Sequence, residues 1–146
     1  MLAALAMYDL PELAGETDAW WRGLRRHLES AGFSQVPERL DRQLSPHAQW
    51  RADKMGKSTI FESPRLLIGL NSFEPGQSHS LHSHSGMDKM YYVVEGEGVF
   101  LLEGRELPMA AGDLLVAPEG VPHGVRNSSG KRLLLLAVLA PGPSIV

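Results

Sequence analysis

The sequence predicts an all-β sandwich or barrel that is preceded by a short helical extension. Two observations support this fold class. First, the chain after residue 54 consists of short β-forming segments, separated at even intervals by turns rich in glycine and proline. Second, 43% of the 146 residues are hydrophobic and 21% are charged, which is typical of a globular protein with one buried core. We therefore divide the chain into an extension, residues 1–54, and a barrel, residues 55–146.

The extension is expected to contain one amphipathic helix between about residues 16 and 31. Acidic and hydroxyl side chains at residues 16–18 supply an N-cap and a negatively charged first turn. Trp20, Leu24 and Leu28 recur at a spacing that places them on one stripe of a helix, and Gly32 ends it. The polar segment that follows is broken by two prolines and is expected to form a loop.

Strand candidates follow in order along the rest of the chain. Each is rich in aliphatic, β-branched or aromatic residues and is bounded by turn residues such as Glu74-Pro75-Gly76. The candidates are Ile60–Glu62, Arg65–Phe73, Ser78–His84, Lys89–Glu95, Val99–Glu103, Glu106–Met109, Leu114–Ala117, Pro122–Arg126 and Arg132–Leu139. An all-β unit of this size has to close on itself or protect its edges, which favours a barrel.

The last strand candidate is apolar without alternation, from Leu133 to Leu139. In an antiparallel sheet this composition indicates that both faces of the strand are covered. The inner face would contact the barrel core. The outer face needs either the Trp20 helix or a second subunit, and we predict a homodimer that is built mainly by barrel strands.

Composition and charge exclude several function classes. The chain has no cysteine, which excludes disulfides, zinc–thiolate sites and iron–sulfur clusters and is compatible with a cytoplasmic location. A net charge of −3 argues against a nucleic-acid partner and against a polybasic membrane anchor. No apolar run approaches the ~20 residues of a spanning helix, and the apolar start of the chain lacks the basic lead of a secretory signal.

The histidines of the barrel are the strongest candidates for a functional site. His82 and His84 are separated by one residue, so on a strand both imidazoles project from the same face. His123 lies on another predicted strand and would complete a set of three neutral nitrogen ligands. This pattern predicts one divalent transition metal per chain. Imidazole suits iron, manganese, nickel, copper and zinc, so the metal itself is left open.

The glycines and prolines around these histidines give the chain a family resemblance. A first motif, with its characteristic spacing, is matched by Gly76, His82, His84 and Gly96. A second motif is matched by Gly112, Pro118, Gly120, His123 and Asn127. In both motifs the chain resembles the cupins over about residues 55–141. The resemblance implies a double-stranded β-helix barrel of the jelly-roll type, a bound metal and a homodimer.

The chain departs from the cupin pattern at one ligand position. Where cupins carry a glutamate ligand, this sequence has Lys89, with Asp88 immediately before it. A lysine cannot coordinate a metal unless burial removes its proton. Three alternatives follow: Asp88 replaces the glutamate, the three histidines hold the metal with water, or the metal is lost and Lys89 holds an anionic ligand. We favour the second and keep Asp88 as a candidate ligand.

Four further residues are candidates for a substrate pocket, namely Lys89, Tyr91, His79 and Arg126. Lys89 or Arg126 would bind a carboxylate, while His79 is a reserve metal ligand and Tyr91 would line the wall. The resemblance implies a metal-dependent protein of small-molecule chemistry, and an open histidine site favours an oxidoreductase of the dioxygenase type. Isomerase and lyase chemistry are alternatives within the enzymes. A binding or sensing protein for a sugar or organic acid is the alternative without turnover.

Overall fold

The computed structural model describes residues 26–27, 30 and 44–143. Of the helix predicted in the extension, Arg26, His27 and Ser30 are helical and exposed, and the rest lies outside the described residues. The described chain resumes with a short 3-10 helix, η1 (Ser45–His47), and then enters the first strand. No described helix has the length and apolar character needed to cross a membrane.

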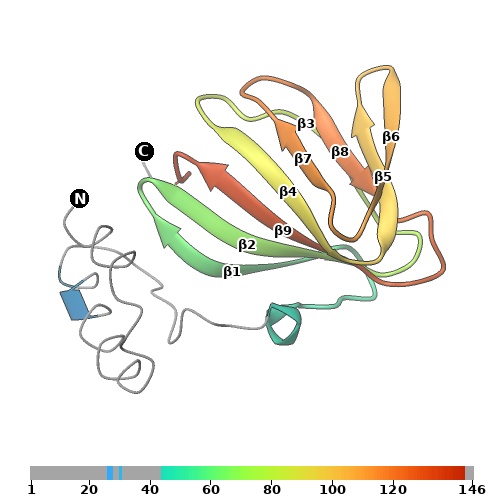
Figure 1. Cartoon of the computed structure of the whole chain (residues 1–146), viewed down its shortest axis with the longest axis horizontal. Helices are drawn as coiled ribbons and strands as arrows, with labels where there is room; N and C mark the ends of the chain where they lie inside the picture. Colours follow the sequence, from blue (N-terminus) through green and yellow to red (C-terminus); the bar gives the residue numbers. More distant parts are fainter. Residues whose placement is uncertain (1–25, 28–29, 31–43, 144–146) are drawn as a thin grey trace.

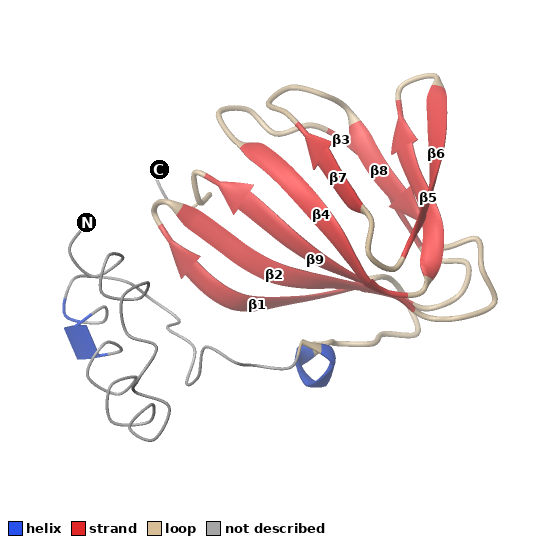
Figure 2. Cartoon of the chain, in the orientation of Figure 1, coloured by secondary structure: helices blue, strands red, loops and turns tan. Residues whose placement is uncertain are grey.

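Nine strands form the body of the described chain (Figure 1). They are β1 (Gly56–Ser63), β2 (Leu66–Phe73), β3 (Ser78–His82), β4 (Asp88–Glu95), β5 (Glu97–Leu102), β6 (Arg105–Ala110), β7 (Leu114–Ala117), β8 (His123–Arg126) and β9 (Leu133–Ala140). One sheet has the order β1-β2-β9-β4-β7 and the other has the order β3-β8-β5-β6, and every pairing is antiparallel (Figure 2). This confirms the predicted all-β class and the double-stranded β-helix.

Most predicted strand boundaries differ from the observed ones by one or more residues, and the first and third strands are examples. The first strand extends over Gly56–Ser63 rather than the short predicted segment, because it pairs with β2 along its whole length. Strand β3 ends at His82, so His84 lies beyond it in the loop. Both differences come from pairing with a neighbouring strand, which local residue preferences do not determine.

The hydrophobic core lies between the two sheets. Its β9 members are Leu133, Leu135 and Ala137, which alternate with outward-facing neighbours as a strand requires. Tyr91 of β4 and Phe100 of β5 are 0% and 2% exposed and meet edge to face, with ring centroids 6.0 Å apart. Leu134, on the opposite face of β9, is also 0% exposed, which agrees with an apolar strand that is covered on both faces at this position.

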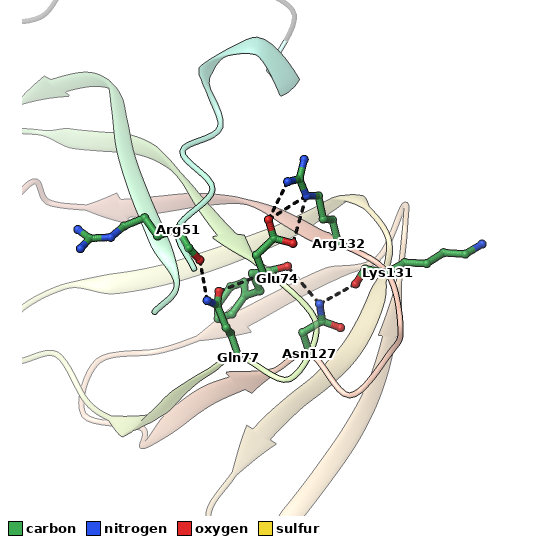
Figure 3. Close-up of polar contacts among 7 residues, drawn as sticks. Arg51, Glu74, Gln77, Asn127, Lys131 and Arg132 are labelled. Carbon is green, nitrogen blue, oxygen red and sulfur yellow. Dashed lines mark hydrogen bonds and ion pairs between the residues drawn. The ribbon is translucent and has the colours of Figure 1, made fainter. Parts of the chain in front are cut away.

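Polar contacts fasten the segment before β1 to the end of the barrel where β3 begins and β9 begins (Figure 3). The Arg132 guanidinium donates to the Glu74 carboxylate at 2.7 Å and lies over the Trp50 ring, 4.6 Å from its centroid. Gln77 Nε2 donates to the Arg51 carbonyl at 2.7 Å. Beside them, the fully buried amide of Asn127 donates to the carbonyls of Phe73 and Lys131, so the motif asparagine ties together two loops. His82 ends β3 and His123 begins β8, so these two histidines lie at the opposite end of that strand pair.

Candidate metal centre

Strands β3 and β8 bring the histidines together through an irregular register. His79 pairs with Val125, and His82 pairs with His123, so the register shifts between His79 and His82. Residues three apart on a regular strand face opposite sides, whereas an extra residue turns both to the same side. Because Val125 belongs to the core, this bulge places both His79 and His82 on the interior side of the sheet.

Gly124 allows β3 and β8 to approach closely at this bulge. A Cβ atom built on Gly124 would lie 2.6 Å from the carbonyl oxygen of His79 and 3.1 Å from the backbone nitrogen of Leu81. Real side chains do not tolerate such contacts with backbone atoms, so glycine is required directly after His123. Gly124 was not among the sequence candidates, since it lies in a variable position of the motif and its neighbour is distant in the chain.

His82, His84 and His123 form one compact cluster. Each offers a ring nitrogen, and these nitrogens all lie within 4.8 Å of one another. The ring centroids of His82 and His123 are 4.4 Å apart, and that of His84 lies 5.0 Å from His82 and 5.4 Å from His123. These spacings suit three ligands around one ion.

Hydrogen bonds fix the orientation of two of the three rings. The Nδ1 atoms of His82 and His123 lie 2.9 Å from the carbonyl oxygens of Ser80 and Val121. A carbonyl oxygen can only accept, so each Nδ1 carries the proton and each Nε2 presents a lone pair. The Nε2 atoms of all three cluster histidines are buried and have no hydrogen-bond partner among the described residues. Buried polar atoms without partners need an explanation, and a metal ion supplies one.

Burial also keeps these imidazoles neutral. It is the main cause that lowers the pKa of His82 and His123 below the usual value, against the raising effect of their carbonyl contacts. Burial and the nearby Lys89 ammonium lower the pKa of His84 to about 4. Neutral imidazole is the form that coordinates a metal, so the donor set fits a transition metal such as iron, manganese, nickel, copper or zinc.

The loop after β3 carries His84 and is tied to the loop that presents His123. The backbone N–H of Gly120 donates to the carbonyl of His84 at 2.9 Å, and Gly120 has a φ of 74°. The Gly86 N–H donates to the Glu119 carboxylate at 2.6 Å. These contacts hold the two motif loops at a fixed separation, which in turn fixes the cluster.

The structure does not bring Asp88 to the cluster. Asp88 is exposed, and its Oδ1 accepts a 2.8 Å hydrogen bond from the Glu119 N–H. Strand alternation turns it to the side opposite Lys89, which is buried. Asp88 thus fastens the loop before His123, and it is not part of the group of three histidines whose ring nitrogens could hold a metal.

Lys89 instead projects into the barrel. Its register partners, Ala117 and Leu139, are buried, and Lys89 itself is 5% exposed. The ammonium lies 4.6 Å from the centroid of the Tyr91 ring. Tyr91 in turn meets His123 edge to face, with centroids 6.1 Å apart, so both predicted pocket residues lie beside the cluster.

The other two pocket candidates have different positions. The ring of His79 packs on His82 with centroids 4.1 Å apart, but its nitrogens are outside the group of three ligand atoms. The Arg126 guanidinium forms two hydrogen bonds with the Glu106 carboxylate, at 3.0 and 2.8 Å, on an exposed surface. Arg126 is therefore not brought to the site.

Lys57 of β1 was not among the sequence candidates, yet it acts on the interior. Together with burial, which is the larger cause, its charge lowers the pKa of His79 and of Lys89.

Comparison with known proteins identifies the family. The cupin domain model matches residues 69–139. The oxalate-binding protein of Thermotoga maritima is 32% identical over 105 residues, which is 71% of this chain and 86% of that protein. The gentisate 1,2-dioxygenase of a Ralstonia species is 28% identical over 85 residues, which is 58% of this chain and 24% of that protein. The crystal structure of TT1209 from Thermus thermophilus is 43% identical, with a TM-score of 0.67, and the match covers 70% of this chain and 97% of that one. The residues matched by the domain model include the strands that carry the histidines, and the oxalate-binding protein is 32% identical over most of its length, so the chain belongs to the cupin superfamily.

Proposed function

We propose that this protein is a metal-dependent cupin that binds one divalent transition metal per chain through His82, His84 and His123 and acts on a small organic molecule. The observation that carries the proposal is the set of three buried Nε2 atoms without hydrogen-bond partners among the described residues. Three protein ligands leave coordination positions for water, dioxygen or substrate, which is the arrangement of catalytic rather than structural sites.

We leave Asp88 out of the proposed ligand set, because its side chain lies on the exposed face of β4, opposite the buried Lys89. Water then completes the coordination. When bound, the metal would supply Lewis-acid or redox chemistry inside the barrel, where β3 ends and β8 begins. The residues of the chain keep the imidazoles neutral, orient two of them through Ser80 and Val121, and exclude bulk water by packing Tyr91 and Phe100 behind His123.

An oxidoreductase of the dioxygenase type is the favoured activity. Its support is the open histidine site together with the similarity to gentisate 1,2-dioxygenase, of which this chain spans about a quarter. The alternative is a protein that binds or senses an organic acid without turnover, favoured by the similarity to an oxalate-binding protein over most of that protein's length. Both functions use the same metal site and the same class of small ligand.

We also propose a cytoplasmic homodimer. The larger sheet has an outer apolar strip, consisting of Met90, Tyr92, Leu114 and Val116. Tyr92 pairs with Leu114 and Met90 pairs with Val116, so the four side chains share the face turned away from the core. Leu114 and Val116 are 58% and 56% exposed, and a second copy of the chain would cover them.

Metal analysis of the purified protein, followed by oxygen uptake with catechols, keto acids and sugars, tests the proposal. We expect up to one first-row transition metal per chain. Oxygen uptake that depends on both metal and substrate supports the dioxygenase. Binding of oxalate to the metal-loaded protein without uptake supports the binding protein. A protein that takes up no metal after reconstitution with iron, manganese, nickel, copper or zinc contradicts both.

A further inference from the structure

Lys89 places a positive charge inside the barrel, and no carboxylate among the described residues pairs with it. Lys89 is 5% exposed, and among the described residues its ammonium forms no salt bridge or hydrogen bond. The ammonium lies over the Tyr91 ring, 4.6 Å from its centroid. A buried charge is unfavourable unless a partner compensates it, and a cation–π contact compensates only part of the lost hydration.

A second lysine makes the burial of the Lys89 charge still less favourable. Lys57 of β1 is near enough to lower the pKa of Lys89, and burial and Lys57 together bring that pKa to about 8. At neutral pH most of the lysine is therefore protonated. The charge of Lys89 also acts on all four imidazoles of the interior, and that of Lys57 acts on three of them, His79, His82 and His84. None of the groups that shift these pKa values is a carboxylate, so among the described residues the surroundings of the cluster carry positive charge without a compensating negative one.

The Tyr91 side chain, whose ring lies under the ammonium, carries a second donor, its hydroxyl. Tyr91 is fully buried, and its hydroxyl has no hydrogen-bond partner among the described residues. Burial raises the pKa of Tyr91 above its usual value, so the hydroxyl keeps its proton. Tyr91 and Lys89 are two apart on β4 and share its interior face, and the Tyr91 ring contacts His123. Two donors therefore lie on the wall next to the metal ligands.

We infer that Lys89 and Tyr91 form a carboxylate subsite, which binds one carboxylate of a small organic acid while another oxygen of that acid faces the metal held by His82, His84 and His123. This inference rests on the proposed function for the metal. A carboxylate neutralises the buried ammonium and accepts from the hydroxyl, which satisfies both unpaired groups together. At position 89, where cupins carry a glutamate that binds the metal, this chain thus has a lysine that binds the acid instead. Uncharged sugars and catechols lack the group that this subsite requires.

Isothermal titration of the full chain with malonate tests the inference, and malonamide serves as an uncharged ligand of similar size. Titrations are made with zinc-loaded and with metal-free protein, on the wild type and on Lys89→Met, Lys89→Gln and Tyr91→Phe. Lys54→Met is the matched control, because Lys54 is exposed and precedes β1. Zinc stoichiometry and circular dichroism are measured on every variant to separate binding from folding.

We expect wild-type protein to bind malonate and to discriminate against malonamide. Both Lys89 variants should weaken malonate at least ~10-fold, and Tyr91→Phe should weaken it about 3- to 10-fold, because hydrogen bonds to a charged group are the strong ones. Malonate binding by zinc-loaded Lys89→Met that equals wild type overturns the subsite and leaves the metal centre intact. Weaker zinc binding in Lys89→Met shows that the lysine is an amine ligand, which also overturns the subsite. If the wild type binds no zinc, the proposed metal centre fails, and the metal-free titrations decide the subsite alone.

Discussion

His82 and His123 are direct register partners on the antiparallel strands β3 and β8, and their ring centroids lie 4.4 Å apart. The Nδ1 atom of each ring contacts the carbonyl oxygen two residues earlier in its own strand or loop, at 2.9 Å in both cases. Two ligands from distant parts of the chain are therefore oriented in the same way by local backbone. A site of this kind is formed before any metal binds, which reduces the reorganisation required for binding.

Removal of two ligands should abolish metal binding. The double variant His82→Ala/His123→Ala leaves only His84 of the cluster, and one imidazole does not hold a divalent ion at micromolar concentration. Metal content by mass spectrometry after reconstitution measures this. His27→Ala is the control, because His27 is exposed and lies outside the cluster. Full occupancy in the double variant would show that the metal binds elsewhere.

Single substitutions at positions 88 and 89 should separate the roles of Asp88 and Lys89. Lys89→Glu places a carboxylate on the interior face of β4 and should tighten zinc about 10-fold or more, since it adds a ligand and removes a cation. Asp88→Asn keeps an oxygen that accepts the Glu119 N–H, so zinc affinity should stay within about 2-fold. Competition with a chelating dye measures both. A loss of zinc affinity in Asp88→Asn would return Asp88 to the ligand set.

The metal-free protein should lose stability as the pH falls from about 6.5 to about 4. Burial and Lys89 lower the pKa of His84 to about 4 in the folded state, whereas an unfolded histidine titrates near ~6.5. Between these values the unfolded chain binds more protons, so the free energy of unfolding decreases with falling pH and levels off below the folded pKa. Urea denaturation at several pH values measures this. His84→Gln should reduce the slope in that window, and an unchanged slope would contradict the assigned shift.

The outer apolar strip should mediate self-association. Val116→Glu places a charge among Met90, Tyr92 and Leu114 and should convert a dimer to a monomer. Leu81→Glu is the matched control, because Leu81 is 48% exposed and lies on β3 of the other sheet. Sedimentation velocity distinguishes the two variants. A wild-type protein that sediments as a monomer at high concentration would refute the proposed dimer.

Gly124 should be intolerant of a side chain. In Gly124→Ala the new Cβ meets the His79 carbonyl at 2.6 Å, so β3 has to move away from β8 and the ligands separate. We expect about 1–3 kcal/mol of lost stability and weaker zinc binding. The control is Gly130→Ala, because a Cβ on Gly130 meets nothing within 4 Å. Equal stability of the two variants would show that the strands accommodate the methyl group.

The fold class and most of the metal cluster follow from the amino-acid sequence alone. Turn residues at even spacing predicted the strands, and the motif spacing around His82, His84 and His123 selected the three histidines that the structure brings together. Both signals are local, because strand alternation and turn chemistry depend on residues that are close in the chain. Strand alternation also places Asp88 and Lys89 on opposite faces of β4. It does not determine which of the two faces is buried.

Which face of β4 is buried, and which residues surround the cluster in the interior, depend on how the strands pair and pack. The bulge that turns His79 inward exists because β3 pairs with β8, and Gly124 permits it from the partner strand. The influence of Lys57 on the interior depends on β1, which lies outside both motifs. Arg126, a pocket candidate in the sequence, instead pairs with Glu106 across the surface. Register, bulges and packing between sheets are properties of strand pairs, so a single strand's sequence does not contain them.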